Sequence, residues 1–334
     1  MPSFKAYRIF NENNKIEGRS ADLTLDDLMP GEVVFKNAYS GVNYKDALAA
    51  TGIGGKVIRK YPLVGGIDAA GTVISSADAR FKTGDEVICT SYDFGVAHDG
   101  GFAQVCRVPA DWVVPLPQGL SLLEAMTLGT AGYTAGLAVE LLELNGLAPA
   151  EGDKGKVLVN GATGGVASLA IDMLAGKGYA VSALTGKDSE HGYLQKLGAQ
   201  EVLARSAVEM GTRPLEKSQW VAAFDSVGGE QLSWLTRTMH QHGLIASFGN
   251  AGGIELKTNV LPFILRGVRL IGVDSAATPM PLRRKVWQRL ASDLKPRHLA
   301  DIANMITLDD LGAYFDKMLK GGIRGRAVVS FSEG

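Results

Sequence analysis

Residues 156–199 read KVLVNGATGGVASLAIDMLAGKGYAVSALTGKDSEHGYLQKLGA, and the rest of the chain is organised around this stretch. It opens on the apolar run 157–159, which is short enough for a buried parallel strand. A glycine-rich turn, 161–165, follows, and apolar residues then recur at the spacing of one helical face. A second apolar run, 179–184, restores strand character. The order strand, helix, strand predicts a βαβ unit within a parallel sheet.

The glycine-rich turn is typical of a dinucleotide site. Glycines let the backbone approach a pyrophosphate, and the helix N-terminus behind them offers unpaired N–H groups. Ala162, Gly164 and Ala167 occupy the three positions of the pattern GxGxxG, so the match is imperfect. A tight turn without a ligand is the alternative, but the strand before it and the helix after it favour a binding site.

The second strand ends in Thr185-Gly186-Lys187. An NAD site usually carries Asp or Glu at this point to bind the ribose 2′-hydroxyl. A cation beside a small hydroxyl instead suits a 2′-phosphate, which an acid would repel. Arg205, which follows the apolar run 201–204, could add a second cation. Lys187 alone could be an ordinary surface lysine, but the missing acid favours NADP(H).

Length and composition limit the classes of protein. A chain of 334 residues with 46% hydrophobic content can form two cores, and its net charge of −1 argues against nucleic acid as a partner. Cys89 and Cys106 are too few for a disulfide framework or a four-thiolate zinc site, and we expect both to be buried. No leader-like N-terminus and no apolar run of about 18 residues occur, so we expect a cytoplasmic protein without a membrane partner.

The chain on either side of the βαβ unit differs in character. Before it, glycine-punctuated segments predict short strands at 32–38, 71–75, 86–90 and 102–108. Ser121, as an N-cap with Glu124 three residues later, begins a long helical segment that covers 125–144. After the unit, alternation continues, with strands at 201–204, 221–224, 244–248 and 268–273, a helix at 230–240, another from Pro281, and a last strand at 326–331.

This alternation predicts an α/β protein of two domains. A doubly wound parallel-sheet domain, 127–276, is expected inside a β-rich domain made of 1–126 and 277–334. Strands that end in small residues place loops at the carboxyl edge of such a sheet, where open α/β folds bind ligands. We expect the site in the cleft between the two domains.

Several ordered segments closely resemble the medium-chain dehydrogenase/reductase superfamily. They are PLVGGIDAAGTV at 62–73, FKTGDEV at 81–87, GGFA at 100–103, and GTAGYTA at 129–135, the last preceded by Glu124-Ala125. The resemblance runs essentially end to end, and it implies a GroES-like catalytic domain together with a Rossmann domain.

Zinc alcohol dehydrogenases of this superfamily carry Cys and His where this chain has Asn43 and Ile67. Neither side chain supplies a thiolate or an imidazole, and the four-cysteine lobe of a structural zinc is absent, so we predict no metal site. His240 and His242 could suggest a metal pair, but we place them at a helix C-terminus, where a cation meets the helix dipole favourably. The resemblance therefore points to the zinc-independent branch of quinone oxidoreductases and enoyl reductases. Segments 43–48, 66–68, 262–266 and 272–275 look most like its acryloyl-CoA reductase group.

The resemblance implies NADPH-dependent hydride addition to an activated C=C, because a site without a Lewis-acid metal stabilises an alkoxide poorly. The expected reaction converts acryloyl-CoA to propionyl-CoA, with hydride added to the β-carbon and a proton to the α-carbon. An NADPH:quinone oxidoreductase with the same site geometry is the alternative. A catalytically silent protein that binds NADPH, as a sensor or structural component, is a further one.

Asn43, Tyr44 and Asp46 follow an expected strand end at Val42 and are the candidate catalytic residues. Tyr44 could donate to the enolate or contact the cofactor, and Asp46 could orient Tyr44 or a water. Asn43 and Asp46 could instead cap the helix that begins near Lys45. The identity of the proton donor stays open.

The resemblance also implies a set of contacts to NADP(H). These residues are Tyr44, Thr163, Gly164, Gly165, Val166, Thr185, Gly186, Lys187, Arg205, Asn250, Ile264 and Ser275.

Two clusters of cations could contact the phosphates of CoA, although a charged helical face is usually only solvated. One comprises Arg283, Arg284, Lys285 and Arg289, and the other Lys56, Arg59 and Lys60. The apolar strand 268–273 lies near a domain edge, so we predict a homodimer that pairs this strand across a two-fold axis.

Overall fold

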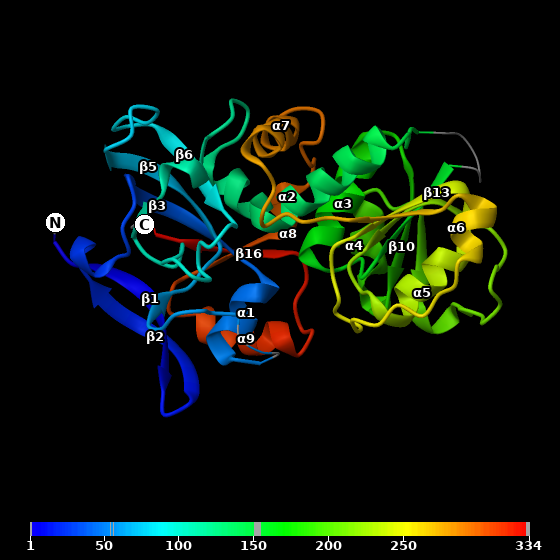
Figure 1. The fold of residues 1–334 in the computed structure, drawn as a ribbon, viewed down its shortest axis with the longest axis horizontal. Helices are drawn as coiled ribbons and strands as arrows, with labels where there is room; N and C mark the ends of the chain where they lie inside the picture. The colour runs from blue at the N-terminus through cyan, green and yellow to red at the C-terminus, as the bar shows by residue number, and fades with distance from the viewer. Residues whose placement is uncertain (1, 54, 56, 150–154, 332–334) are drawn as a thin grey trace. The chain divides into compact units, whose positions relative to one another are not determined.

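Figure 1 shows the fold in a computed structural model, which describes residues 2–53, 55, 57–149 and 155–331. Contacts between residues divide the chain into two compact units. The first comprises Met1–Ala131, Ala276–Gln288 and Leu299–Gly334, and the second comprises Gly132–Ser275 and Arg289–His298. One unit is therefore formed by a central segment with a short later addition, and the other by both ends of the chain.

The first unit is rich in β-strands. Its described residues form a three-stranded sheet of order β2-β1-β4 and a seven-stranded sheet of order β15-β16-β3-β5-β6-β8, in which β7 also pairs with β3. Inward side chains such as Phe35, Val73 and Val87 form an apolar core on the larger sheet. The strands are β1 (Phe4–Glu12), β2 (Lys15–Leu23), β3 (Val33–Val42), β4 (Leu63–Val64), β5 (Asp68–Ser76), β6 (Glu86–Thr90), β7 (Val105–Val108), β8 (Val113–Pro115), β15 (Ala303–Ile306) and β16 (Arg326–Ser330).

Helices α1 (Tyr44–Thr51) and α9 (Leu311–Leu319) pack in a second core of this unit. Tyr7 and Phe102 stand edge to face there, and Phe315 of α9 contacts both rings. Gly52 ends α1 with a left-handed φ of 72°, a conformation that costs glycine little. Two more helices, α7 (Met280–Leu290) and α8 (Leu299–Ile302), complete the C-terminal part of the chain.

The second unit contains a parallel sheet of order β11-β10-β9-β12-β13-β14 in its described residues. In chain order its strands run 3-2-1-4-5-6, the doubly wound arrangement in which strand order reverses between β9 and β12. The elements are β9 (Lys156–Asn160), α3 (Gly165–Gly176), β10 (Ala180–Thr185), α4 (His191–Lys196), β11 (Glu201–Ala204), β12 (Trp220–Asp225), α5 (Gly229–Thr238), β13 (Met239–Ser247), α6 (Leu261–Arg266) and β14 (Arg269–Gly272). The predicted α/β class and the βαβ unit are confirmed.

Helix α2 (Leu122–Leu144) contains a kink at Gly129, where φ is 50° and ψ is −154°. Its predicted N-cap is confirmed, because the Ser121 hydroxyl accepts from Glu124 N at 3.2 Å and Glu124 Oε2 accepts from Ser121 N at 2.9 Å. This reciprocal pair satisfies backbone groups that a helix start leaves open.

Three predictions of local structure need correction. The helix expected over 230–240 ends at Thr238, and the next strand begins at Met239, so His240 and His242 lie in β13 and not at a helix C-terminus. The hairpin of β1 and β2 was not predicted, because its alternation of apolar and polar residues is weak. The strand expected over 102–108 covers only Val105–Val108. None of the described helices is long and apolar enough to cross a membrane.

Candidate functional site

The end of β10 brings two cations together in the second unit. In the parallel pairing of β10 with β11, Thr185 lies opposite Ala204, so Gly186 and Arg205 are the next residues on adjacent strands. A Cβ atom placed on Gly186 would lie 3.2 Å from the Arg205 guanidinium carbon, which shows that the arginine lies over this glycine. Thr185 Oγ1 accepts from Lys187 N at 3.0 Å. Hydroxyl, lysine and arginine therefore share one edge of the sheet.

These residues fit a 2′-phosphorylated nucleotide. Arg205 is exposed and Lys187 partly exposed, so both cations can reach an anion in solvent. The nearest acid in the sequence, Asp188, has its carboxylate 3.9 Å from His191 Nε2. A guanidinium binds phosphate oxygens through several N–H groups at once.

The glycine-rich turn lies at the point where strand order reverses. Gly161 has a φ of 56°, and a Cβ atom there would overlap the Ser226 hydroxyl, so a larger residue would collide with the loop after β12. Gly164 N donates to Gly161 O at 2.9 Å, and α3 begins at the next residue. The turn therefore presents backbone and a helix N-terminus at its surface, as a pyrophosphate site requires.

Buried side chains fix the loops next to this turn. Asp225 Oδ1 accepts from Asn160 Nδ2 at 2.6 Å and from Gly228 N at 3.0 Å, and Asp225 Oδ2 accepts from the Ser247 hydroxyl at 3.0 Å. Asn160 Oδ1 in turn accepts from Ser226 N at 2.8 Å. One carboxylate thus holds the carboxyl ends of β9, β12 and β13 in register.

The remaining predicted cofactor residues of this unit lie in two places. Asn250 and Ser275 follow the carboxyl ends of β13 and β14, on the edge that carries the glycine-rich turn. Ile264 lies on α6, where it is 68% exposed. That helix ends in Arg266, which donates to Met239 O at the opposite end of β13. The structure therefore groups Asn250 and Ser275 with the turn but leaves Ile264 apart from it.

In the first unit, the predicted catalytic segment forms the N-terminus of α1. Asn43 is the N-cap, and Asp46 Oδ2 accepts from Asn43 N at 2.8 Å in a capping box. Asp46 Oδ1 accepts from Ile67 N at 3.1 Å, so both carboxylate oxygens of this buried residue bind backbone N–H groups. Tyr44 is the first helical residue and is 51% exposed. The structure supports the capping interpretation for Asp46 and leaves the tyrosine hydroxyl accessible.

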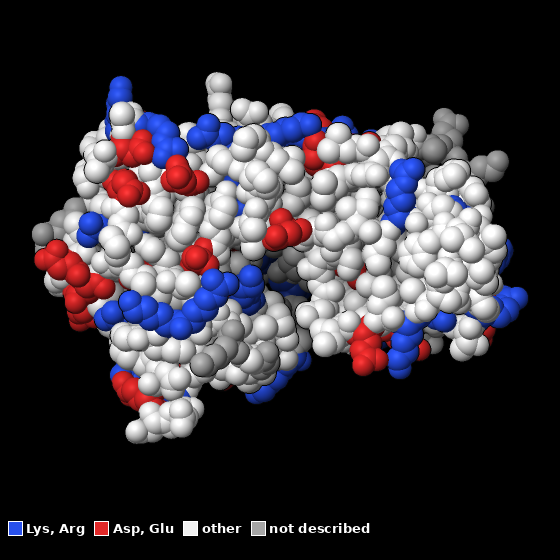
Figure 2. All heavy atoms as spheres, viewed as in Figure 1, with Lys and Arg blue, Asp and Glu red and all other residues white. Residues whose placement is uncertain are grey.

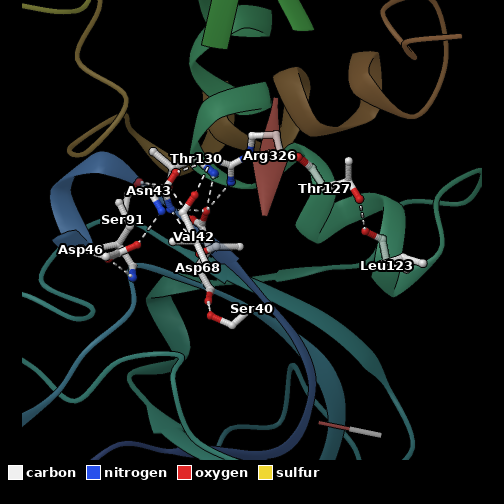
Figure 3. Close-up of polar contacts among 12 residues, drawn as sticks. Ser40, Val42, Asn43, Asp46, Asp68, Ser91, Leu123, Thr127, Thr130 and Arg326 are labelled. Carbon is white, nitrogen blue, oxygen red and sulfur yellow. Dashed lines mark hydrogen bonds and ion pairs between the residues drawn. The ribbon is translucent and has the colours of Figure 1, made fainter. Parts of the chain in front are cut away.

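A buried polar cluster lies behind this helix start (Figure 3). Its centre is Asp68, at the beginning of β5, whose side chain is fully buried. Asp68 Oδ2 accepts from Asn43 Nδ2 at 2.7 Å and from Thr130 N at 2.8 Å, and lies 3.5 Å from Arg326 Nη2. Asp68 Oδ1 faces the hydroxyl of Thr130 at 2.5 Å.

Arg326 connects four segments of the first unit. Its guanidinium donates to Val42 O at 2.7 Å, to Asn43 Oδ1 at 3.0 Å and to Thr127 O at 3.1 Å. The C-terminal strand thereby fixes the end of β3, the start of α1 and the first turns of α2 around Asp68. The Asn43 side-chain oxygen accepts from Arg326, and its side-chain nitrogen donates to Asp68. These two bonds fix the orientation of the amide.

The charges of this cluster do not balance if every group is ionised. Two buried carboxyls, Asp46 and Asp68, face one buried guanidinium, that of Arg326. Burial and the charge of Asp68 raise the pKa of Asp46 to about 7. Burial also raises the pKa of Asp68, and the nearby guanidinium opposes that shift. Near neutral pH the cluster can therefore hold a proton that the same residues would have lost in water.

Glycines make room for the cluster. A Cβ atom on Gly41 would lie 2.8 Å from Arg326 Nη2, and one on Gly129 would overlap Asp68 Oδ2. The kink of α2 at Gly129 thus brings the Thr130 N–H and hydroxyl onto the carboxylate.

The sequence analysis assigned no role to Asp68, Thr130 or Arg326. The first two stand inside the segments that carry the family resemblance. An aspartate at the head of the run Ala69-Ala70-Gly71 was the available signal, because an acid in a buried strand needs partners.

Three of the seven cations proposed for CoA, Arg283, Arg289 and Arg59, bind other side chains of the protein. Arg283 is fully buried, with its guanidinium 4.4 Å above the Tyr92 ring. Arg289 binds Glu140 and Asp293, each at 2.7 Å. Arg284 and Lys285 are exposed, Arg59 pairs with Asp93, and Lys56 lies outside the described residues. Among the described residues, no three of His, Cys, Asp and Glu come together as metal ligands would.

Comparisons with known proteins bear on these two sites. Residues 29–118 match the model of the alcohol dehydrogenase GroES-like domain. The chain is 46% identical over 319 residues to the acrylyl-CoA reductase AcuI of Ruegeria pomeroyi, covering 95% of this chain and 96% of AcuI. The chain belongs to the medium-chain dehydrogenase/reductase family. The predicted family and the GroES-like and Rossmann-like parts are confirmed.

Other members of this family share nearly the whole fold. YhfP of Bacillus subtilis, whose name assigns it to the quinone oxidoreductases, is 48% identical over 98% of both chains. Its crystal structure with NAD bound superposes with a TM-score of 0.95, covering 99% of this chain and all of that one. The YhdH oxidoreductase of Salmonella enterica, solved in complex with NADP, is 43% identical with a TM-score of 0.94, covering 98% of this chain and all of the other. Members of the family thus bind nicotinamide dinucleotides, with and without the 2′-phosphate.

Proposed function

We propose that this protein reduces the activated C=C of a short enoyl-CoA, acryloyl-CoA to propionyl-CoA, with NADPH and without a metal. The observation that carries the proposal is the 46% identity to an acrylyl-CoA reductase over almost the full length of both chains. Two features of the site support it. A pair of cations replaces the usual acid at the end of β10, and Asn43 and Ile67 replace the residues that hold zinc in alcohol dehydrogenases.

The second unit would hold the cofactor. Lys187 and Arg205 would bind the 2′-phosphate, and Thr163 to Val166 would place backbone N–H groups against the pyrophosphate. Asn250 and Ser275 are available on the same edge of the sheet. When bound, NADPH supplies the hydride that the β-carbon of the substrate receives.

The first unit would act on the substrate. Tyr44, half exposed at the start of α1, can donate its hydroxyl to the oxygen on which negative charge develops. Asn43 has its amide fixed by Asp68 and Arg326, so it would present a rigid surface beside the reacting carbons. Asp46 is buried and bound to backbone N–H groups, so its role would be to position Asn43 and Tyr44.

Quinone reduction is the second candidate, and the 48% identity to YhfP favours it. A quinone takes up its negative charge on oxygen, so its reduction needs no proton delivered to carbon. The same cofactor site would serve both reactions.

Steady-state oxidation of NADPH by the purified protein distinguishes these functions. We expect turnover with acryloyl-CoA, less with crotonyl-CoA, and kcat/KM for a benzoquinone at least about tenfold lower. A higher value for the quinone would favour the second candidate. If no acceptor oxidises NADPH although NADPH binds, the protein is a silent binder of the cofactor. Addition of a zinc chelator should leave the rate unchanged, and a loss of activity would contradict the metal-free proposal.

We further propose that the protein is a homodimer formed through the second unit. Strand β14 is the outermost strand of its sheet, and an unpaired edge can continue into another copy. Apolar residues in the segment that precedes β14 in the chain are exposed, among them Ile254 at 85%, Val260 at 64% and Ile264 at 68%. Figure 2 shows a broad uncharged surface where Figure 1 places α6. A monomeric mass at micromolar concentration in analytical ultracentrifugation would contradict this assembly.

A further inference from the structure

The two oxygens of the Asp68 carboxyl have different surroundings. Three N–H groups converge on Oδ2, from Asn43, Thr130 and Arg326. Oδ1 instead faces the hydroxyl of Thr130. An N–H group can only donate, so Oδ2 is held as an acceptor, whereas a hydroxyl can either donate to Oδ1 or accept a proton from it. The bond between Asp68 Oδ1 and Thr130 Oγ1 is thus one across which a proton can move.

The charges around Asp68 allow this carboxyl to hold a proton and to lose it again. Burial favours the neutral form. Arg326 and the two other N–H donors to Oδ2 stabilise the anion once the proton has left. Cys89 is a further titratable group in electrostatic contact with Asp68; its thiol is buried, and that burial raises its pKa.

Thr130 is the end of this path that lies nearer to solvent. It is only partly buried, whereas Asp68 is fully buried. Its Oγ1 also lies 3.2 Å from the hydroxyl of Ser91. Ser91 and Tyr92 both have positive φ angles, 68° and 52°, which non-glycine residues rarely adopt. Strained backbone of this kind often marks a functional site, and here it fixes a hydroxyl against Thr130.

We propose that Thr130 protonates the α-carbon of the substrate and that Asp68 supplies the proton through it. This inference rests on the proposed reduction of a C=C bond. After hydride addition the substrate is an enolate. As its C=O re-forms, the electron pair at the α-carbon takes the hydroxyl proton of Thr130, and Thr130 Oγ1 takes the proton of Asp68 Oδ1. One C–H bond forms, two O–H bonds break and one forms, and Asp68 becomes a carboxylate beside Arg326. Water restores its proton through Thr130 after product release.

A matched pair of substitutions tests the role of Thr130. Thr130→Val keeps the shape of the side chain and the backbone N–H to Asp68 but removes the hydroxyl, whereas Thr130→Ser keeps the hydroxyl. We expect kcat with acryloyl-CoA to fall about 100-fold in Thr130→Val and less than about threefold in Thr130→Ser, with KM for NADPH unchanged in both. Equal kcat values for the two variants would overturn the inference.

Asp68→Asn tests the source of the proton. An amide can accept from the N–H groups at Oδ2 and donate to Thr130, but it cannot give up a proton. The fall of kcat at high pH, which deprotonation of Asp68 causes in the wild type, should disappear, and the residual rate should be independent of pH. If the wild-type and Asp68→Asn profiles have the same shape, Asp68 does not supply the proton. If this variant does not fold, because Arg326 loses its partner, the Thr130 pair decides the question.

Infrared spectroscopy of the protein without cofactor gives a readout that does not depend on activity. At pH 6 the carbonyl region should contain a band of protonated Asp68 in addition to that of protonated Asp46. The Asp68 band should vanish in Asp68→Asn, persist in Asp46→Asn, which removes only the other band, and shift in Thr130→Val. Absence of any band that Asp68→Asn removes would overturn the inference. If the wild type shows the band but no acceptor oxidises NADPH, the proposed function has failed while the proton on Asp68 stands.

Discussion

The two candidate sites of this protein are built in opposite ways. In the cation turn, Thr185–Lys187 with Arg205, Arg205 is exposed and Lys187 partly exposed, and three of the four residues are adjacent in the sequence. The polar cluster of Asn43, Asp46, Asp68, Thr130 and Arg326 is buried except for the partly buried Thr130, and the chain must bring its members together from four separate segments. The first site depends on residue types at a strand end, and the second depends on the packing of a whole unit.

This difference determines how each site responds to change. Exposed cations are solvated without a ligand, so their removal should weaken binding and leave the fold intact. Buried charged groups stabilise one another, so a change to one residue of the cluster alters the protonation of the others or the stability of the fold. The predictions below test this contrast in order of decreasing effect.

The largest effect should come from Gly129→Ala. A Cβ atom there would overlap Asp68 Oδ2, and its backbone angles suit glycine alone. We expect the free energy of unfolding to fall by about 5 kcal/mol, measured by urea denaturation, because overpacking and a broken buried ion pair act together. The control is Gly84→Ala, which also has a positive φ, of 96°, but meets no atom within 4 Å. Equal losses in the two variants would show that backbone strain alone accounts for the effect.

The second prediction concerns pH and Asp46. Its pKa is raised in the folded protein from 3.8 to about 7, so the folded state binds the extra proton and its stabilising effect is lost as pH rises from 4 to 7. At about 1.4 kcal/mol for each pH unit, the free energy of unfolding should fall by about 4 kcal/mol over this range, relative to Asp46→Asn.

Asp310→Asn is the control, at a group whose pKa shift has the opposite sign. Hydrogen bonds from Thr307 lower the pKa of Asp310 from 3.8, so the stability that this carboxylate adds is lost only as pH falls through that value. Its removal should therefore leave the fall between pH 4 and 7 nearly unchanged. Chemical denaturation at several pH values measures the free energy of unfolding of the wild type and of both variants. If the free energy of unfolding changes with pH in the same way in Asp46→Asn and the wild type, the buried cluster does not hold the extra proton.

The third prediction concerns the exposed cation turn. The double change Lys187→Glu with Arg205→Glu should raise the Kd for NADPH about 100-fold, or about 3 kcal/mol, because two attractive charges become repulsive. The Kd for NADH should change less than about threefold, and the melting temperature by only a few degrees. Titration of the protein with NADPH or NADH, followed by the fluorescence of the reduced nicotinamide, measures both Kd values. Lys257→Glu, an exposed site in the same unit, is the control. Equal loss of both cofactors would show that these residues do not bind the 2′-phosphate.

The smallest effect should come from Ser121→Ala. It removes one half of the capping box of α2 and should cost about 1 kcal/mol of unfolding free energy. Ser121→Thr keeps the hydroxyl and should recover most of that loss. Thermal denaturation of the three proteins suffices, and a loss above about 2 kcal/mol would mean that this cap also supports the buried cluster.

The elements of the parallel sheet were predictable because each strand and helix has its own apolar pattern. Strand β11 was predicted with the observed bounds, and β9, β10, β12 and β14 with shifts of about one residue. The boundary near His240 was wrong because the helix and the following strand share one continuous amphipathic segment. The hairpin β1–β2 was missed because its two strands carry little regular alternation of apolar and polar residues.

The amino-acid pattern alone predicted the doubly wound domain, the absence of an acid at the end of β10, and, through the family resemblance, Asn43 and Ile67 where zinc alcohol dehydrogenases carry metal ligands. These are properties of residue types at fixed places along a strand or turn. Only the tertiary structure decided that Asp46 caps a helix, that Asp68 is the centre of the buried cluster, and that Thr130 and Arg326 complete it. Arg326 and its partner Val42 are 284 residues apart in the chain, and the protonation of a buried carboxyl depends on charges that only the folded protein brings close.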